Sequence, residues 1–184
     1  MRLVLLGLPG CGKGTQARLL VERLGLTYIG TGDILRDAIA RGTEMGREVA
    51  PLMERGLLVP DHRVNDVVAE LFRGESRPEK FVTDGYPRTY AQAISFDALL
   101  RLEHLDLTHV ILLTISDDEV VRRMLARGRE DDNEDTIRRR LNEFHKNNDT
   151  LVEHYTRCGV LREIPAVGAV EDIHANIVRA LGAK

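Results

Sequence analysis

The chain has 184 residues, 43% hydrophobic and 30% charged, with a formal net charge of −3 at pH 7. This length predicts one compact domain with a full hydrophobic core. The slightly negative balance argues against a protein that binds nucleic acid mainly through a basic field. Two cysteines, Cys11 and Cys158, are too few for a disulfide scaffold or a four-cysteine zinc site, which favours a reducing, cytoplasmic setting. No stretch approaches about 18 uninterrupted apolar residues, so we expect neither export nor membrane insertion.

Short apolar runs alternate with segments of helical periodicity along the chain. The runs are nearly continuous in apolar character, which indicates strands that are covered on both faces. The predicted strands are residues 3–6, 28–29, 81–83, 110–115 and 160–164. The predicted helices are residues 13–24, 61–73, 89–101, 117–127, 134–157 and 170–181. This alternation predicts an α/β protein with a doubly wound, parallel five-stranded sheet between two helical layers.

Residues 7–15, with the sequence GLPGCGKGT, form a glycine-rich turn between the first strand and the first helix. Glycines let successive backbone N–H groups and the positive end of the helix face one anion, and Lys13 adds a mobile positive charge. The segment therefore predicts a polyphosphate site, and a plain turn with a surface lysine is the alternative. Gly14 occupies the position where the general pattern has Ser or Thr, which moves the hydroxyl to Thr15. We interpret Cys11 as a small packing residue.

Residues 30–60 interrupt the alternation with two short helical patterns, at residues 33–41 and 44–55. They are predicted to form a small helical insertion. Thr31 is the expected N-cap of its first helix, and Arg36 lies one turn into that helix. Taken alone, this segment is typical of an ordinary capped helix.

Polar residues of opposite charge follow the predicted strand at residues 81–83. If this strand neighbours the first one, Asp84 emerges beside the glycine-rich turn, where a carboxylate suits Mg²⁺ bound to phosphate. Gly85 permits a close backbone approach, and Arg88 can bind a phosphate through two parallel hydrogen bonds. Gln92 lies on the same helical face and can pair with an adenine edge. A turn with a surface salt bridge is the alternative.

Arginines are concentrated between residues 122 and 140. Two of them lie one turn apart on one helical face, and either Asp132 or Asn133 can cap the next helix. Several guanidinium groups would then face one point, where they could neutralise the charge that spreads over a phosphoryl group in transfer. We select as functional Arg123, Arg127, Arg129 and Arg140. We interpret Arg122, Arg138 and Arg139 as a solvated face of ion pairs.

The six histidines show no spacing that is typical of a metal site. None forms a His-x-x-x-His pair, and no cluster of histidine with cysteine is expected. We interpret all six as surface or packing residues, namely His62, His104, His109, His145, His154 and His174.

Taken together, these motifs resemble the adenylate kinases of the nucleoside monophosphate kinase family. The similarity rests on four segments in the family's order, and it spans almost the whole chain. They are the loop at residues 7–16, Thr31-Gly32-Asp33 with Arg36, Asp84-Gly85-Tyr86-Pro87-Arg88 with Gln92, and residues 127–140 around Asp131-Asp132-Asn133. The resemblance implies a P-loop fold and reversible, Mg²⁺-dependent phosphoryl transfer from ATP to AMP that gives two ADP.

The resemblance also implies a role for individual residues. ATP would be bound by Gly10, Cys11, Gly12, Lys13, Gly14, Thr15, Arg123, Arg127 and Gly168. AMP would be bound by Thr31, Arg36, Leu57, Leu58, Val59, Gly85, Tyr86, Pro87, Arg88, Gln92, Arg129 and Arg140. The implied catalytic set is Lys13, Arg88, Arg127, Arg129 and Arg140. Mg²⁺ would be held through nucleotide phosphates and water near Thr15, Asp33 and Asp84.

The implied domain has a core of residues 1–29, 61–125 and 133–184, an AMP-binding insertion at residues 30–60, and a lid at residues 126–132. Only three residues separate Arg127 from Asp131, so the chain resembles the short-lid bacterial enzymes. The extended lid and its cysteine-bound zinc are not expected, and no zinc site is predicted. Closure of the lid, which would keep water from the γ-phosphate, is implied by the resemblance.

Three alternative functions differ from this interpretation in sequence features. A UMP/CMP kinase of the same fold usually differs at the positions of Thr31 and Gln92, which here look adenylate-like. A guanine-nucleotide switch protein would carry Asn-Lys-x-Asp and Asp-x-x-Gly motifs, which we do not find. A catalytically silent nucleotide-binding protein is disfavoured because the lysine, the acid and the arginines are all present. We expect a cytoplasmic monomer with ATP, AMP and ADP as ligands and with neither nucleic acid nor membrane as a partner.

Overall fold

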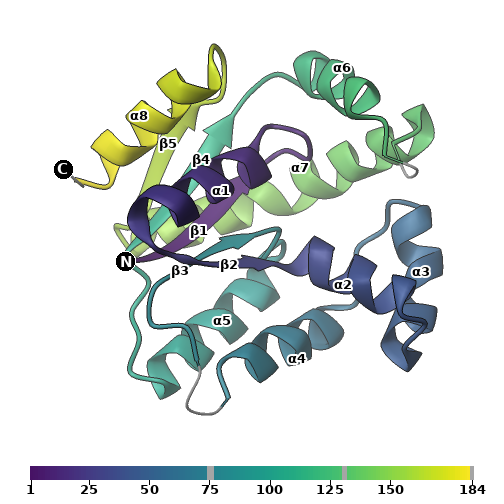
Figure 1. The fold of residues 1–184 in the computed structure, drawn as a ribbon, viewed down its shortest axis with the longest axis horizontal. Helices are drawn as coiled ribbons and strands as arrows, with labels where there is room; N and C mark the ends of the chain where they lie inside the picture. Colours follow the sequence, from purple (N-terminus) through teal and green to yellow (C-terminus); the bar gives the residue numbers. More distant parts are fainter. Residues whose placement is uncertain (74–76, 130–131, 183–184) are drawn as a thin grey trace.

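A computed structural model describes residues 1–73, 77–129 and 132–182 of the chain. The described residues form a parallel five-stranded sheet in the order β2-β3-β1-β4-β5 (Figure 1). The strands are β1 (Arg2–Gly7), β2 (Thr27–Gly30), β3 (Phe81–Asp84), β4 (His109–Thr114) and β5 (Leu161–Pro165). All five predicted strands are confirmed, each shifted at its ends by two residues or fewer.

The helices also follow the predicted order. They are α1 (Lys13–Leu24), α2 (Thr31–Ala40), α3 (Glu44–Glu54), α4 (Asp61–Leu71), α5 (Tyr90–Leu102), α6 (Asp117–Arg127), α7 (Glu134–Arg157) and α8 (Val170–Ala180). One local prediction is wrong: Gly30, not Thr31, is the N-cap of α2. The Thr31 hydroxyl instead donates to the Gly85 carbonyl oxygen at 2.9 Å, so it joins the insertion to the end of β3.

Two hydrophobic clusters cover the two faces of the sheet, which confirms the three-layer α/β/α prediction. One cluster includes Leu20 of α1, Met124 of α6 and Ile177 of α8. The other includes Val68 of α4 and Phe96 of α5. The long helix α7 contributes to both clusters, and Figure 1 shows it running along the sheet behind β1. A continuous apolar strand can be buried on both faces only in such an arrangement.

The register of the sheet brings two predicted site segments together. β1 pairs with β3 on one side, with Leu5 opposite Asp84, and with β4 on the other. The strands that precede the glycine-rich turn and Asp84 are therefore neighbours, and both motifs leave the sheet at its carboxyl edge. Ligands bind at this edge in open parallel sheets. None of the helices in the described ranges combines the length and apolarity needed to cross a membrane.

Candidate active site

A cavity of about 640 Å³ opens at the carboxyl ends of the strands, between the glycine-rich turn, the insertion and the arginines that follow α6. Most of the predicted site residues line it. They are Gly10, Gly12, Lys13, Gly14, Thr15, Thr31, Asp33, Arg36, Leu57, Leu58, Val59, Asp84, Gly85, Pro87, Arg88, Gln92, Arg123, Arg127, Arg129 and Arg140. One cavity thus brings together three groups of residues that were predicted separately. They are the glycine-rich turn, the predicted AMP site and the arginine cluster.

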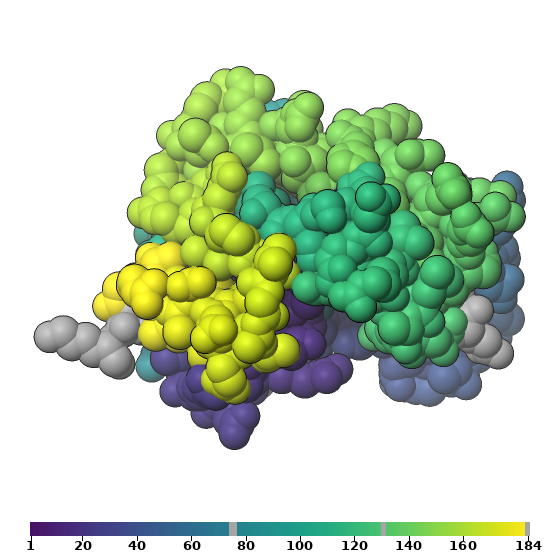
Figure 2. All heavy atoms as spheres, turned by 90° about the horizontal axis from the view of Figure 1, so that it is seen from above, coloured from purple at the N-terminus to yellow at the C-terminus, as the bar shows by residue number. Residues whose placement is uncertain are grey.

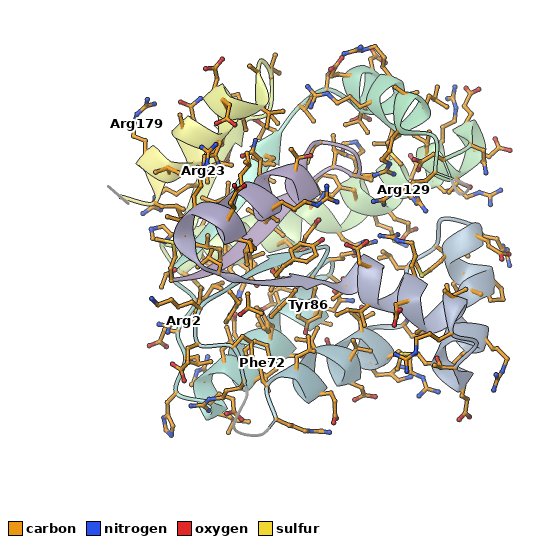
Figure 3. The ribbon with its side chains drawn as sticks, viewed as in Figure 1. Arg2, Arg23, Phe72, Tyr86, Arg129 and Arg179 are labelled. Carbon is orange, nitrogen blue, oxygen red and sulfur yellow. The ribbon has the colours of Figure 1, made fainter. Side chains whose placement is uncertain are left out.

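Three predicted residues lie outside the lining of this cavity. Cys11 is buried in the core beneath the loop, as its interpretation as a packing residue requires. Tyr86 is buried between the sheet and the helices α4 and α5 (Figure 3), and its hydroxyl donates to Asn65 at 2.8 Å. Gly168 is exposed in the segment between β5 and α8. Figure 2 shows the surface of the yellow C-terminal residues next to the teal-green surface of α6. Tyr86 thus supports the site from beneath, and a contact of Gly168 with a base stays a prediction.

The start of α1 is arranged as an anion site. Gly12 is its N-cap with φ +108°, a conformation that a side chain would strain, and α1 has neither a side-chain cap nor an acidic residue in its first turn. No side chain of the helix itself therefore occupies its first N–H groups, and residues 12–15 line the cavity. The Lys13 ammonium donates to the carbonyl oxygens of Gly7 at 2.8 Å and Leu8 at 2.9 Å. A bound phosphate would replace these carbonyl groups.

The packing of Asp84 gives a reason for the glycine at position 14. A Cβ atom added to Gly14 would lie 3.3 Å from Oδ2 of Asp84. The usual Ser or Thr at this position would therefore crowd the carboxylate, and the next hydroxyl, on exposed Thr15, lines the cavity instead. The oxygen atoms of Thr15, Asp33 and Asp84 form a hard donor set of the kind that Mg²⁺ prefers, directly or through water.

Tyr28 links two of these acids, and sequence reasoning missed it. Its hydroxyl lies 3.0 Å from Oδ2 of Asp33 and 3.3 Å from Oδ2 of Asp84. Burial raises the pKa of Tyr28, and the negative charge of Asp84 raises it further, so the phenol keeps its proton and can donate it. The only sequence signal was its position as the first residue of the short strand predicted at residues 28–29.

The Gly85 carbonyl oxygen lies at the centre of the predicted AMP site. It accepts hydrogen bonds from Thr31 Oγ1 at 2.9 Å and from Arg88 Nε at 2.8 Å. Gly85 has φ +82°, and an added Cβ would lie 2.9 Å from the Arg88 guanidinium, so the Arg88 side chain packs where only a glycine leaves room. Surrounding protein lowers the pKa of Arg88, which nevertheless stays protonated at neutral pH because an arginine titrates far above it.

Gln92 is held by the protein on both sides of its amide. Its Oε1 accepts from the Arg88 backbone N–H at 2.7 Å, and its Nε2 donates to Asp61 Oδ1 at 2.7 Å. The side chain is 2% exposed. One N–H and one lone pair remain for a further partner, which is what an adenine edge would need. Asp61, a residue that the sequence analysis did not select, thus orients Gln92.

A buried carboxylate organises the arginines. Asp132, whose side chain is fully buried, accepts two hydrogen bonds from Arg127 at 2.8 Å each and one from Arg140 at 3.2 Å. Asn133 caps α7, which settles the alternative left open by the sequence and leaves Asp132 for the arginines. Arg129 lies beside them and faces the insertion (Figure 3). The predicted lid also includes Glu130 and Asp131, which lie outside the described residues.

Other arginines separate into two groups. Arg123 donates to Glu119 at 2.7 Å and to the carbonyl oxygen of Ala166 at 3.1 Å, so it ties α6 to the end of β5 at the edge of the cavity. Arg122 and Arg138 form exposed ion pairs with acids on their own helices, as predicted for a solvated face. Arg139 is exposed as well and donates to a backbone carbonyl of the insertion.

Comparison with known proteins identifies the family. The family model described as adenylate kinase matches residues 5–160. The chain belongs to the adenylate kinase family. An adenylate kinase of Thermus thermophilus is 46% identical over 184 residues, which cover 98% of this chain and 96% of that protein. Those of Nocardia farcinica and Rhizobium meliloti are 42% and 41% identical, over 99% and 98% of this chain and 99% and 100% of their own lengths.

Membership of the adenylate kinase family makes the chain a phosphotransferase that binds nucleotides. It favours neither a guanine-nucleotide switch nor a catalytically silent binding protein. The resemblance found in the sequence motifs is therefore confirmed. The family match also covers the glycine-rich turn, the insertion and the arginine-rich segment, which are the three walls of the cavity.

The interpretation of the histidines needs one correction. His154 and Cys158 do form a cluster, together with Asp97 of α5, and their candidate ligand atoms all lie within 4.8 Å of one another. The two residues are four positions apart at the end of α7, a spacing that places side chains on one helical face and that could have been read from the sequence. This cluster is not among the residues that line the cavity.

Proposed function

We propose that the chain catalyses reversible transfer of the γ-phosphoryl group of ATP to AMP, giving two ADP. The observation that carries this proposal is the single cavity, in which an open helix N-terminus with Lys13 faces a second polar site built around Arg88 and Gln92. Phosphoryl transfer needs two phosphate groups aligned in one space that excludes water, and little covalent chemistry from the protein.

The residues around the glycine-rich turn would bind ATP. Backbone N–H groups of residues 10–15 would surround its phosphates, and Lys13 would exchange its two loop carbonyls for phosphate oxygens. Arg123 would contact the nucleotide from the opposite wall of the cavity. Mg²⁺ bound to the phosphates, near Thr15, Asp33 and Asp84, would supply positive charge that neutralises them.

The residues after β3 and the insertion would bind AMP. Arg88 and Arg36 would bind its phosphate, and Gln92 would use its remaining N–H and lone pair for the adenine edge. The backbone of residues 57–59, which lines the cavity, would cover the base.

The arginines between the two sites would stabilise the group in transfer. An oxygen of the AMP phosphate forms a bond to the γ-phosphorus while the bond from that phosphorus to the β–γ bridging oxygen breaks, and ADP leaves. Arg88, Arg127, Arg129 and Arg140 would neutralise the negative charge that develops in this step, so no nucleophilic side chain is needed.

We also propose a division of the chain that follows from these roles. Residues 30–60 would form the AMP-binding insertion, and residues 126–132 a short lid that closes over the phosphates and excludes water. The core would be residues 1–29, 61–125 and 133–184. The two halves of the site come from one chain, which supports a monomer as the active unit, and we propose that it works in the cytoplasm.

A coupled assay with ATP, Mg²⁺ and each nucleoside monophosphate in turn tests the proposal. Because Gln92 presents one donor and one acceptor, we expect kcat/KM for AMP to exceed the values for UMP, CMP and GMP by about 100-fold or more. Equal or faster turnover of UMP or CMP would replace the proposal by a pyrimidine-nucleotide kinase. Binding of ATP and AMP without turnover would refute catalysis.

A further inference from the structure

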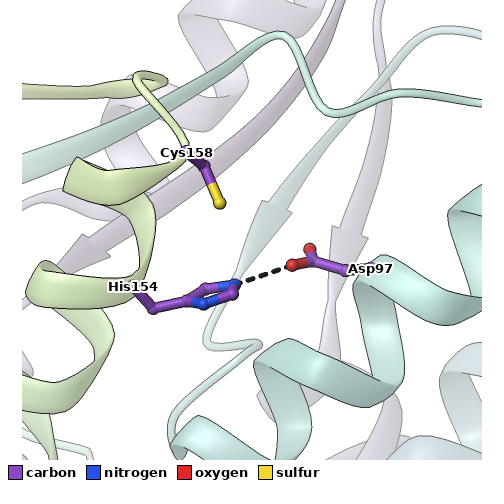
Figure 4. A group of neighbouring side chains, drawn as sticks. All are labelled: Asp97, His154 and Cys158. Carbon is purple, nitrogen blue, oxygen red and sulfur yellow. Dashed lines mark hydrogen bonds and ion pairs between the residues drawn. The ribbon is translucent and has the colours of Figure 1, made fainter.

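A cluster of three potential metal ligands lies away from the catalytic cavity, between α5 and the end of α7. Asp97 of α5, His154 of α7 and Cys158, the C-cap residue of α7, converge there (Figure 4). Nε2 of His154 is 2.7 Å from Oδ2 of Asp97, and Figure 4 shows the Cys158 sulfur directed toward the pair. Carboxylate, imidazole and thiolate are the three side-chain types that most often bind zinc.

The surroundings hold these side chains in place. The imidazole of His154 packs edge-to-face between two rings, at 5.5 Å from Tyr90 and 4.8 Å from Tyr155 between centroids. The side chains of His154 and Asp97 are only 11% and 20% exposed, whereas Cys158 is exposed. A site of this kind has fixed imidazole and carboxylate ligands and an opening to solvent on the side of the thiol.

A buried hydroxyl next to the cluster lacks a hydrogen-bond partner. Tyr155 is 1% exposed, and its hydroxyl bonds to no other group in the described residues. The ring that carries this hydroxyl packs against the imidazole of His154, with the two ring centroids 4.8 Å apart. A buried polar group without a partner is uncommon and calls for an explanation, such as a bound ion or water.

We propose that Asp97, His154 and Cys158 form a binding site for a divalent transition-metal cation of the zinc type. Three protein ligands would leave the fourth tetrahedral position to a water molecule on the exposed side. The ion would replace the hydrogen between Nε2 and Oδ2, the imidazole proton would move to Nδ1, and the thiol proton would pass to solvent. The charges of thiolate and carboxylate then match the two positive charges of the ion.

Binding there would cross-link two helices that also carry residues of the cavity. α5 holds Gln92 near its start, and α7 holds Arg140 about a quarter of the way along its length. The metal would therefore stabilise the packing of α5 on α7 without entering the reaction. An ion present at 100 times its dissociation constant lowers the unfolding equilibrium constant by about 100-fold.

Titration of the apoprotein with Co²⁺ tests the proposal, because a thiolate ligand gives an intense charge-transfer absorption that oxygen and nitrogen ligands lack. We expect one Co²⁺ per chain with that band, displacement of the band by Zn²⁺, and a melting temperature that rises with metal concentration. Cys158→Ser should abolish the band. His154→Gln should weaken Co²⁺ binding by at least about 10-fold, because even the loss of a residue that only hydrogen-bonds to a metal ligand weakens metal affinity by that factor.

His145→Gln is the matched control. His145 also pairs with a carboxylate, that of Asp117 at 2.9 Å, but no cysteine belongs to this pair among the described residues, so its loss should leave the Co²⁺ spectrum unchanged. Turnover of ATP and AMP by Cys158→Ser should equal that of the natural chain, which shows that the variant is folded. Absence of the band, or a band that persists in Cys158→Ser and His154→Gln, would overturn the proposal.

Discussion

The two halves of the cavity are held together in different ways. On the side of Arg88, the protein satisfies its own polar groups: Thr31 and Arg88 share the Gly85 carbonyl, and Gln92 joins Arg88 to Asp61. On the side of the glycine-rich turn, the start of α1 has no side-chain cap, and the Lys13 ammonium bonds two carbonyl groups and the Cys11 sulfur of its own loop.

This difference separates stability from catalysis. The polar network around Gln92 is part of the folded structure, because Gln92 is buried and both sides of its amide are bonded to other protein groups. Removing one member leaves another unsatisfied, at a cost of about 1–3 kcal/mol. The residues around Lys13 instead line the cavity, and the Lys13 ammonium bonds the backbone of its own loop, not a network of side chains from other segments. Substitutions in the two halves are therefore expected to affect different measurements.

The largest expected effect is on the side of the glycine-rich turn. Lys13→Met should reduce kcat by about 10³-fold, the scale of other charge-stabilising groups in phosphoryl transfer. The free energy of unfolding should fall by no more than about 1 kcal/mol, because Lys13 is only partly buried at the wall of the cavity and its loss leaves no charged group of the protein without a partner. Steady-state kinetics and urea unfolding of the same preparation measure both quantities.

Arg88→Ala extends this test to the reacting phosphates. We expect a similar loss of turnover, about 10³-fold, because Arg88 faces the same space between the two sites. Near-normal activity in a folded Arg88→Ala protein would remove Arg88 from the mechanism. A Lys13→Met protein that is less stable by more than about 1.5 kcal/mol would show that the glycine-rich turn is also part of the structural network.

A smaller effect with the opposite signature is expected at Gln92. Gln92→Leu removes the acceptor of the Arg88 N–H and the donor to Asp61, so the free energy of unfolding should fall by about 2 kcal/mol. In a chain of this size, that lowers the melting temperature by about 4–8 °C. KM for AMP should rise as well, because the amide no longer meets the base. Calorimetry and AMP saturation curves give the two values.

Asp61→Asn is the control for Gln92→Leu. It keeps an oxygen at the position that accepts from Gln92 Nε2, so most of the stability and the AMP affinity should remain. If Gln92→Leu leaves the melting temperature unchanged, the two halves of the cavity do not differ in the way that their hydrogen bonds suggest.

Much of the fold could be predicted because its signals are local. Apolar runs and helical periodicity predicted every strand and helix of the described residues, although the edge strand β5 is buried only at Ile164 and is not covered on both faces as its apolar run predicted. The glycine-rich turn and Asp84 could be recognised as motifs. The sequence placed Asp84 beside the glycine-rich turn only on the condition that β1 and β3 are neighbours. Their pairing could not be predicted, because the pairing of strands that are distant in sequence depends on the whole sheet.

Residues that act through distant partners could not be found in this way. Tyr28, Asp61 and Asp132 each orient a site residue, but their partners come from other segments or from a loop, so no spacing in the sequence reveals them. Thr31 looked like an N-cap because its residue type and position fit one. The hydroxyl instead bonds to Gly85, a residue of the turn after β3, which only the tertiary structure brings near.

The smallest expected effect concerns Glu119, which bonds Arg123 on the side of the cavity that we propose for ATP. Hydrogen bonds from Arg122 and Arg123 lower the pKa of Glu119 to about 2 from its ordinary 4.5. A carboxyl group with a lowered pKa stabilises the fold above its unfolded-state pKa, and this contribution is lost as the pH falls through the folded-state pKa. Glu119→Gln should therefore be less stable than the natural chain above about pH 4.5, and the difference should shrink between pH 4.5 and 2.

Urea unfolding of both proteins across this pH range measures the difference, and Arg122→Met apportions it between the two arginines. With Arg123 as the remaining partner, the pKa of Glu119 should move back toward 4.5, so the contribution is lost at a higher pH than in the natural chain. A stability difference that stays constant down to pH 2 would mean that Glu119 gains nothing from its charge. Arg123 would then be held at the cavity mainly by its hydrogen bonds to the carbonyl oxygens of Cys11 and Ala166. In that case both halves of the cavity would be fixed by hydrogen bonds within the protein: the proposed ATP side by bonds to the backbone, and the proposed AMP side by Gln92.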